Sequence, residues 1–157
     1  MDWKRIVDEL ALEPHPEGGW YREVYRSPTR VETARGPRSA LTTIYYLLQA
    51  GQLSRWHVID ADEVWHFYGG APLELLTYAP LESRLQAHRL GPSAAGGEPV
   101  CVVPAGVWQA ARCHENYSLV GCSVGPGFEY SGFALVASMP ELSHHFRETL
   151  QTYRDLL

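Results

Sequence analysis

Short runs of apolar and β-branched residues, many of them alternating with polar ones, recur along most of the chain. Ten such runs, separated by turn-forming residues, cover residues 19–26, 41–48, 53–59, 63–68, 73–79, 83–90, 99–105, 107–111, 117–124 and 133–137. This spacing predicts ten β-strands in close succession. Because no helical segment separates them, the pattern favours an all-β fold, an antiparallel sandwich or barrel, over a parallel α/β sheet.

The two ends of the chain have helical periodicity instead. Near the start, apolar residues recur at helical spacing: Trp3, Ile6, Val7, Leu10 and Leu12. Pro14 forbids continuation, so the pattern predicts a helix over residues 2–12. Near the other end, one apolar stripe contains Leu142, Phe146, Leu150, Tyr153 and Leu157, which predicts a helix over about residues 140–156. We expect one domain over residues 1–157, with its barrel over about residues 18–137.

Charge and composition exclude several classes of partner. The chain of 157 residues has 13 basic and 18 acidic residues, a net charge of −5, and no run of lysine or arginine. Phosphate binding needs clustered cations, so we expect neither nucleic acid nor an anionic membrane as a partner. No stretch approaches the roughly 20 apolar residues of a membrane span. The acidic N-terminus and three cysteines without C-x-x-C spacing predict a cytoplasmic protein.

The segment 51–70, GQLSRWHVIDADEVWHFYGG, concentrates the candidate chemistry. On two strands joined by an acidic bend at residues 60–62, His57 lies on one face of the first strand, and Glu63 shares a face of the second with Trp65 and Phe67. If both faces point inward, His57 and Glu63 meet inside the barrel. His66 has the opposite parity and is expected on the other face of its strand. The segment is compatible with a metal site, an acid–base site or an acidic turn.

The spacing within this segment resembles the first motif of the cupin superfamily, which runs Gly, five residues, His-x-His, three or four residues, Glu, six residues, Gly. The second cupin motif has a counterpart at Pro104 and Gly106, with Gln109 at the position of its histidine. Cupins are antiparallel jelly-roll barrels, also described as a double-stranded β-helix. The resemblance therefore implies that fold, and it assigns the four usual metal-ligand positions to His57, Ile59, Glu63 and Gln109.

Two of those four positions lack a strong metal ligand. Isoleucine cannot coordinate, and a neutral amide oxygen is a weak donor to a transition metal. A tight site usually has three or four protein ligands, so no cofactor is favoured. A divalent Fe, Mn, Ni, Cu or Zn ion held by His57, Glu63 and Gln109 remains the alternative.

Five stretches extend the resemblance to one cupin-like family, catalogued as domain of unknown function 985. They read HPEGGWYREVYRS, TTIYYLL, HVIDADEVWHFYGG, VVPAGVWQAA and LVGCSVGPGFEYSGFAL, and they lie between about residues 5 and 137. The resemblance implies a homodimeric cupin with an internal pocket that is accessible to solvent and no settled reaction. Val58 stands where a basic residue is expected in this family, which argues against a preference for anionic ligands.

These observations lead to one leading function and two alternatives. By resemblance to cupin sugar epimerases, His57 is the expected base, Glu63 orients it, and Tyr130 is the acid, in a metal-independent isomerase or epimerase acting on a sugar-like or small polar carbonyl compound. The expected ligand-binding residues are Trp65, Phe67, Gln109, Glu23, Tyr25 and Glu129. The alternatives are a module that binds a small metabolite without transforming it, and a metal-dependent oxygenase or hydrolase.

Overall fold

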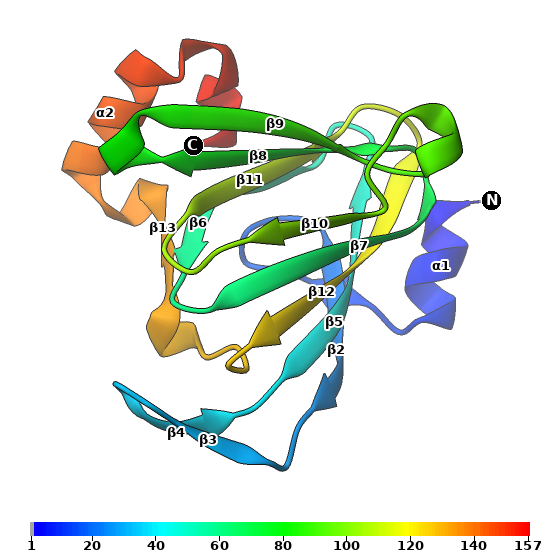
Figure 1. Cartoon of the computed structure of the whole chain (residues 1–157). Helices are drawn as coiled ribbons and strands as arrows, with labels where there is room; N and C mark the ends of the chain where they lie inside the picture. Colours follow the sequence, from blue (N-terminus) through cyan, green and yellow to red (C-terminus); the bar gives the residue numbers. More distant parts are fainter. Residues whose placement is uncertain (1) are drawn as a thin grey trace.

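The computed structural model describes residues 2–157 and shows two antiparallel β-sheets packed face to face (Figure 1). In spatial order, the first sheet contains β1 (Glu13–Pro14), β2 (Trp20–Arg26), β5 (Thr42–Gln49), β12 (Tyr117–Gly125), β7 (Asp62–Gly70) and β10 (Val100–Val103). The second contains β13 (Phe133–Leu135), β6 (Leu53–Ile59), β11 (Trp108–Cys113), β8 (Leu73–Ala79) and β9 (Arg84–Leu90). The prediction of an antiparallel all-β fold is confirmed.

Each of the ten predicted runs forms a strand, and three further strands have no counterpart in the sequence prediction. These are β1 and the two strands of a separate hairpin, β3 (Arg30–Thr33) and β4 (Gly36–Ser39), at the bottom of Figure 1. The hairpin strands are only four residues long, and their sequences, RVET and GPRS, contain no run of apolar residues by which a pattern could identify them. The first residue of the predicted domain lies outside the described residues.

The main core lies between the two sheets. Alternate side chains of both sheets point into it, and the largest of them are Tyr46, Leu48, Trp65, Leu73, Leu75 and Leu90. The alternation follows from the pleat of the strands, which places every second residue on the inner face. The same inward positions, continued toward one end of the sandwich, supply the site described below.

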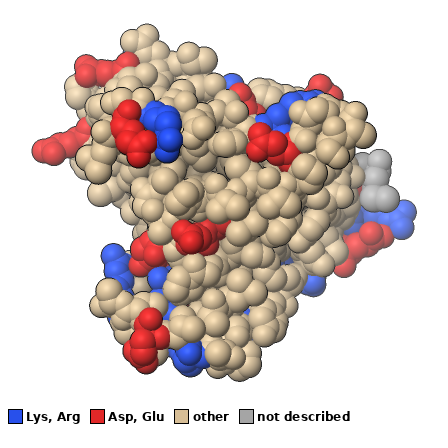
Figure 2. All heavy atoms as spheres, viewed as in Figure 1, with Lys and Arg blue, Asp and Glu red and all other residues tan. Residues whose placement is uncertain are grey.

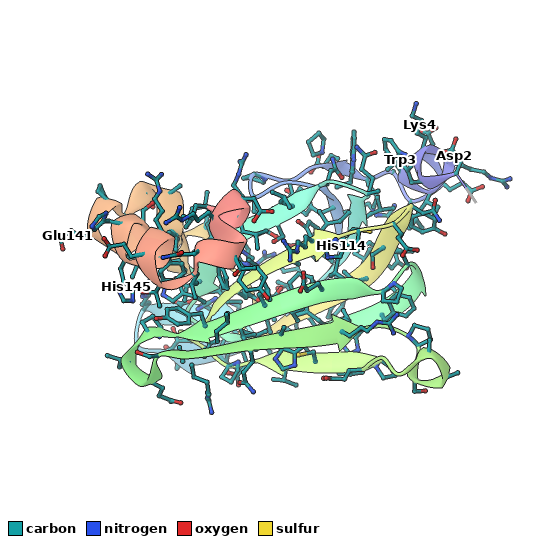
Figure 3. The ribbon with its side chains drawn as sticks, turned by 90° about the horizontal axis from the view of Figure 1, so that it is seen from above. Asp2, Trp3, Lys4, His114, Glu141 and His145 are labelled. Carbon is teal, nitrogen blue, oxygen red and sulfur yellow. The ribbon has the colours of Figure 1, made fainter. Side chains whose placement is uncertain are left out.

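Helices cover part of the outer face of each sheet. The helix α1 (Trp3–Glu9) packs Ile6 against Leu47 of β5. It is shorter than the predicted 2–12, because Ala11 takes a positive φ of 50° and thereby ends the helix. In Figure 3 the labelled residues Asp2, Trp3 and Lys4 of this region lie at the end of the molecule opposite Glu141 and His145.

The predicted C-terminal helix is two elements. The helix α2 (Pro140–Thr149) ends before Leu150, and a 3₁₀ segment, η5 (Gln151–Leu156), follows. Phe146 and Leu156 are both buried against the outer face of the second sheet. A continuous helix would rotate Leu156 away from the stripe that contains Phe146, so the break at Leu150 returns Leu156 to the sheet.

The surface has no extended block of one charge in the view of Figure 2. Acidic and basic side chains there form small groups separated by uncharged surface. Among residues 2–157, no helix is both long enough and apolar enough to cross a membrane.

Candidate functional site

A cavity of about 180 Å³ lies between the sheets, where β2, β5, β6, β7 and β12 meet the segment 126–133. Deep in it are buried or nearly buried side chains that can ionise: His15, Glu17, Tyr46, His57, Glu63 and Cys122. Charged and aromatic side chains surround its opening: Glu13, Tyr21, Glu23, Arg26, Phe128, Glu129, Tyr130 and Phe133. The cavity therefore combines a buried acid–base cluster with an acidic and aromatic mouth.

His57 presents one defined ring nitrogen to this cavity. Its Nδ1 lies 2.8 Å from the carbonyl oxygen of Arg55 and 3.2 Å from Oε2 of Glu17. Two acceptors at one nitrogen favour the tautomer with the proton on Nδ1, which leaves the lone pair on Nε2. Burial lowers the pKa of His57, so the ring is neutral at neutral pH and Nε2 can accept a proton.

Glu17 is the carboxyl group in contact with His57, and the sequence prediction does not include it. It is 6% exposed, and its Oε1 accepts a hydrogen bond of 2.9 Å from Ser54. Burial raises its pKa. His15 lies beside it, with Nδ1 at 3.8 Å from Glu17 Oε1. The sequence signal available for both residues is the stretch HPEGGW, which the family resemblance contains without assigning it a role.

The backbone around Gly18 holds Glu17 in place. The amide of Arg55 donates a 3.1 Å hydrogen bond to the carbonyl oxygen of Glu17, next to His57 on the same strand. Gly18 has a φ of +112°, and a Cβ there would lie 2.0 Å from the carbonyl oxygen of Leu53. Only glycine fits such a position, so the glycine determines how closely Glu17 approaches β6.

Glu63 belongs to a second network, formed with Gln109 and Trp65. The indole Nε1–H of Trp65 donates to Gln109 Oε1 at 2.9 Å, and Gln109 Nε2–H donates to Glu63 Oε2 at 2.5 Å. The two bonds fix the orientation of the amide. Burial, the main cause, raises the pKa of Glu63 to about 7. Near neutral pH a substantial fraction of this carboxyl group is therefore protonated.

The predicted ligand-binding residues separate into two groups. Trp65 and Gln109 are buried behind the cavity wall, and Phe67 packs into the core between the sheets. None of the three lines the cavity. Gln109 contacts Glu63 directly, Trp65 contacts it only through Gln109, and Phe67 contributes only to the packing of the core. His66 lies on the opposite face of β7, and its ring stacks with Tyr68 at 6.5 Å between centroids.

Glu23 and Glu129 are joined by Arg26 at the opening. Arg26 donates to both oxygens of Glu23, at 3.0 and 2.9 Å, and lies 3.4 Å from Oε1 of Glu129. It also donates to the carbonyl oxygen of Phe128 at 3.1 Å. Arg26 thereby ties β2 to the segment that forms the opposite rim of the cavity.

Tyr25 is a correction to the sequence prediction. A bulge between Glu23 and Tyr25 pairs Glu23 with Ile44, whose side chain lines the cavity, but pairs Tyr25 with Thr43. Strict alternation would put Glu23 and Tyr25 on one face of the strand. The extra residue of the bulge instead turns Tyr25 to the other face. Tyr25 is 48% exposed and lies outside the cavity lining.

Tyr130 stands at the rim among other aromatic rings. Its ring is edge-on to Phe128 at 5.1 Å and to Phe133 at 6.2 Å, and Phe133 lies 5.6 Å from the His57 ring. A hydrogen bond with Tyr130, the main cause, raises the pKa of Tyr21 to about 12. Tyr130 is 55% exposed, so its hydroxyl reaches the opening rather than the base of the cavity.

Comparison with known proteins gives a consistent family relationship. The family model described as Cupin superfamily (DUF985) matches residues 4–136. A hypothetical protein from Leishmania major is 30% identical, with a TM-score of 0.84 over 97% of this chain and 98% of its own. A protein from Shewanella oneidensis is 32% identical, with a TM-score of 0.84 over 99% of this chain and 94% of its own.

Two more distant similarities concern one sequence and one solved structure. An uncharacterised protein of Saccharomyces cerevisiae is 24% identical over 90% of this chain and 78% of its own. Oxalate decarboxylase from Bacillus subtilis is 16% identical, with a TM-score of 0.60 over 92% of this chain and 34% of its own. The last similarity concerns the cupin fold alone.

The cavity residues do not fit a tightly held metal ion. Of the four positions that cupin resemblance assigns to ligands, Ile59 contributes only an apolar side chain, and Gln109 has its oxygen occupied by Trp65. Among residues 2–157, the one group of three histidine, cysteine or acidic ligands within 4.8 Å of one another lies elsewhere in the fold. We therefore derive no catalytic step that uses a metal in this cavity.

The raised pKa of Glu63 predicts a pH-dependent stability that Glu63→Gln removes. Between its ordinary value of 4.5 and about 7, the folded protein holds a proton that the unfolded chain has released. The free energy of unfolding therefore falls by about 3 kcal/mol as pH rises through this window. Chemical denaturation at several pH values measures the difference between wild type and Glu63→Gln. The exposed Glu115→Gln is the control, and a difference that does not change with pH would contradict the prediction.

Gly18→Ala should destabilise the protein more than a substitution that only adds backbone strain. Gly36→Ala is the matched control: Gly36 has a φ of +99°, and its Cβ would meet nothing within 4 Å. The control should cost about 1–2 kcal/mol, whereas Gly18→Ala adds a clash with backbone and should cost several kcal/mol. Urea unfolding of both variants checks this, and equal losses would show that the close approach to Leu53 is unimportant.

Proposed function

The chain belongs to the DUF985 family of the cupin superfamily, and on this premise we propose that its cavity binds a small polar carbonyl compound and isomerises or epimerises it by acid–base chemistry. The observation that carries this proposal is the state of the two buried groups. His57 is held as a neutral ring with its Nε2 lone pair available. Glu63 is a carboxyl group of which a substantial fraction is protonated near neutral pH. Two environments that shift pKa values in this way supply a base and an acid together.

In the proposed reaction His57 Nε2 removes the proton from the carbon next to the substrate carbonyl. The electron pair of that C–H bond forms the C=C bond of an enol, and the carbonyl oxygen takes a proton, or a hydrogen bond, from Glu63. Return of a proton to carbon completes the isomerisation. Return from the opposite face gives the epimer, with Tyr130 at the rim as the donor. A positioned base of this kind contributes about 10²- to 10⁴-fold in rate.

The charges around the cavity favour an uncharged ligand. Its lining includes five glutamates, Glu13, Glu17, Glu23, Glu63 and Glu129, and one arginine, Arg26. Arg26 is engaged by Glu23 and Glu129, so it is not available to pair with an anion. The rim rings of Phe128, Tyr130 and Phe133 can pack on the apolar face of a sugar-like molecule. We infer a neutral hydroxy-carbonyl compound as the substrate class.

We also propose that the protein is a cytoplasmic homodimer. A cytoplasmic location is supported by the three cysteines, Cys101, Cys113 and Cys122, which are buried and unpaired. A dimer is supported by apolar side chains on the outer face of the first sheet: Val100 and Val102 on the edge strand β10 are 49% and 55% exposed. Unpaired, apolar sheet edges invite association.

Substitution of Val102 by glutamate should dissociate this dimer, because a charge at the centre of an apolar contact must be desolvated. Sedimentation velocity measures the masses. The control is Leu81→Glu, at a fully exposed leucine in the η1 turn (Pro80–Glu82) that follows β8. A wild-type chain that sediments as a monomer, or a Val102→Glu variant that remains dimeric, would contradict this interface.

The catalytic proposal predicts exchange of carbon-bound hydrogen with solvent. Glyceraldehyde, dihydroxyacetone, xylose and fructose are incubated with the protein in deuterium oxide, and deuterium at the carbon next to the carbonyl is followed by NMR. At least one compound should exchange, and His57→Gln should slow this exchange about 10²- to 10⁴-fold. His66→Gln, on the outer face of β7, the strand that carries Glu63, is the matched control and should retain full activity. A compound that binds but never exchanges would instead identify a binding module.

A further inference from the structure

Three side chains that bind metals converge at the edge strands β9 and β10, outside the lining of the cavity. Donor atoms of His88, Glu98 and Cys101 all lie within 4.8 Å of one another. None of the three lines the cavity. We propose that they form a site for a divalent cation of the zinc class, which joins the open edges of the two sheets.

The position of the cluster explains what a metal would do there. His88 is on β9, the edge strand of the second sheet, and Cys101 is on β10, the edge strand of the first. Glu98 lies in the connection between these strands. The chain thus leaves one sheet edge, passes through a loop and enters the other edge, and a shared ion would fasten the two edges at the base of that loop.

The backbone already holds these positions close together. Glu98 N–H donates to Arg89 O at 2.8 Å, and Gly91 N–H donates to Glu98 O at 2.9 Å. Cys101 is paired with Trp65 in the register of β10 and β7. Since hydrogen bonds of the sheets fix the main chain on both sides, binding an ion requires rotation of side chains and little ordering of backbone.

The donor atoms have a spacing and a chemistry suited to zinc. His88 Nδ1 and Glu98 Oε2 are 3.6 Å apart, whereas the ligand atoms of a tetrahedral zinc ion are about 3.3–3.7 Å apart. A thiolate together with an imidazole selects zinc-class ions over Mg²⁺ or Ca²⁺, which prefer oxygen ligands alone. Three protein ligands leave the fourth position to water.

Thr77 supplies the second hydrogen bond that a metal-bound histidine needs. Its Oγ1 lies 3.4 Å from His88 Nε2. With Nδ1 on the metal, Nε2–H donates to this hydroxyl, and the ring is fixed in the tautomer and orientation for binding. A thiol binds a metal as the thiolate, so the ion must displace the proton of Cys101.

Titration of the untagged full chain, stripped of metal with a chelator, tests the site. Co²⁺ is added while the thiolate-to-cobalt charge-transfer absorption is recorded, and Zn²⁺ is then used to displace it. We expect one ion per chain. His88→Gln and Cys101→Ala should weaken binding at least about 100-fold, and Thr77→Val about 10- to 100-fold. The matched controls His66→Gln and Cys113→Ala should bind as wild type does.

Three results would overturn the proposal. They are the absence of a thiolate band in the wild-type chain, retention of the band in both His88→Gln and Cys101→Ala, and loss of binding in His57→Gln instead. Thermal unfolding without metal shows whether each variant is folded. If Cys101→Ala is not folded, His88→Gln decides the outcome, since the His88 side chain is 21% exposed and its replacement leaves the core intact. Added Zn²⁺ should raise the unfolding temperature of the wild type but not that of His88→Gln or Cys101→Ala, because these variants lack a ligand.

Discussion

The burial of groups that can ionise is the constraint on which the cavity depends. His57, Glu17 and Glu63 are each less than a tenth exposed, and a buried polar group without a partner costs several kcal/mol. Each of them is therefore matched: His57 by the carbonyl of Arg55 and by Glu17, Glu17 also by Ser54, and Glu63 by Gln109. Several features of the local structure follow from the need to provide hydrogen-bond partners for these three side chains.

The same burial determines which protonation states are available. Removing the groups from water disfavours charge, so the pKa of His57 falls while those of Glu17 and Glu63 rise. Consequently, at pH values at which an isolated glutamate is an anion, these buried side chains carry less charge than they would in water. A neutral base and a neutral acid in one enclosed space are suited to moving protons on an uncharged substrate, and the acidic rim reinforces that selectivity.

The pattern of the sequence was sufficient for an antiparallel all-β fold, since alternation and turn residues identify strands directly, whereas the cupin architecture was implied by the family resemblance. It also indicated that His57 and Glu63 meet inside the fold if both of their strand faces point inward, and both line the cavity. It could not identify Glu17, because Glu17 reaches His57 from a turn before β2, through a contact between residues far apart in the sequence. Tyr25 was misplaced because one inserted residue in β2 shifts the alternation. The hydrophobic pattern indicates which face of a strand is buried, but it identifies neither β-bulges nor contacts between residues that are far apart in the sequence.

Gln109 shows why a motif position alone does not determine chemistry. Gln109 lies at the position that corresponds to a cupin histidine. If its amide rotated to turn the oxygen toward the cavity, the hydrogen bond from Trp65 would break, and the amide oxygen would face the carboxyl group of Glu63. Trp65 is itself part of the core between the sheets. The packing of the sandwich thus fixes the amide, and the amide orients Glu63, whereas burial is what raises the pKa of Glu63. A position that binds metal in other cupins serves here to keep an acid in place.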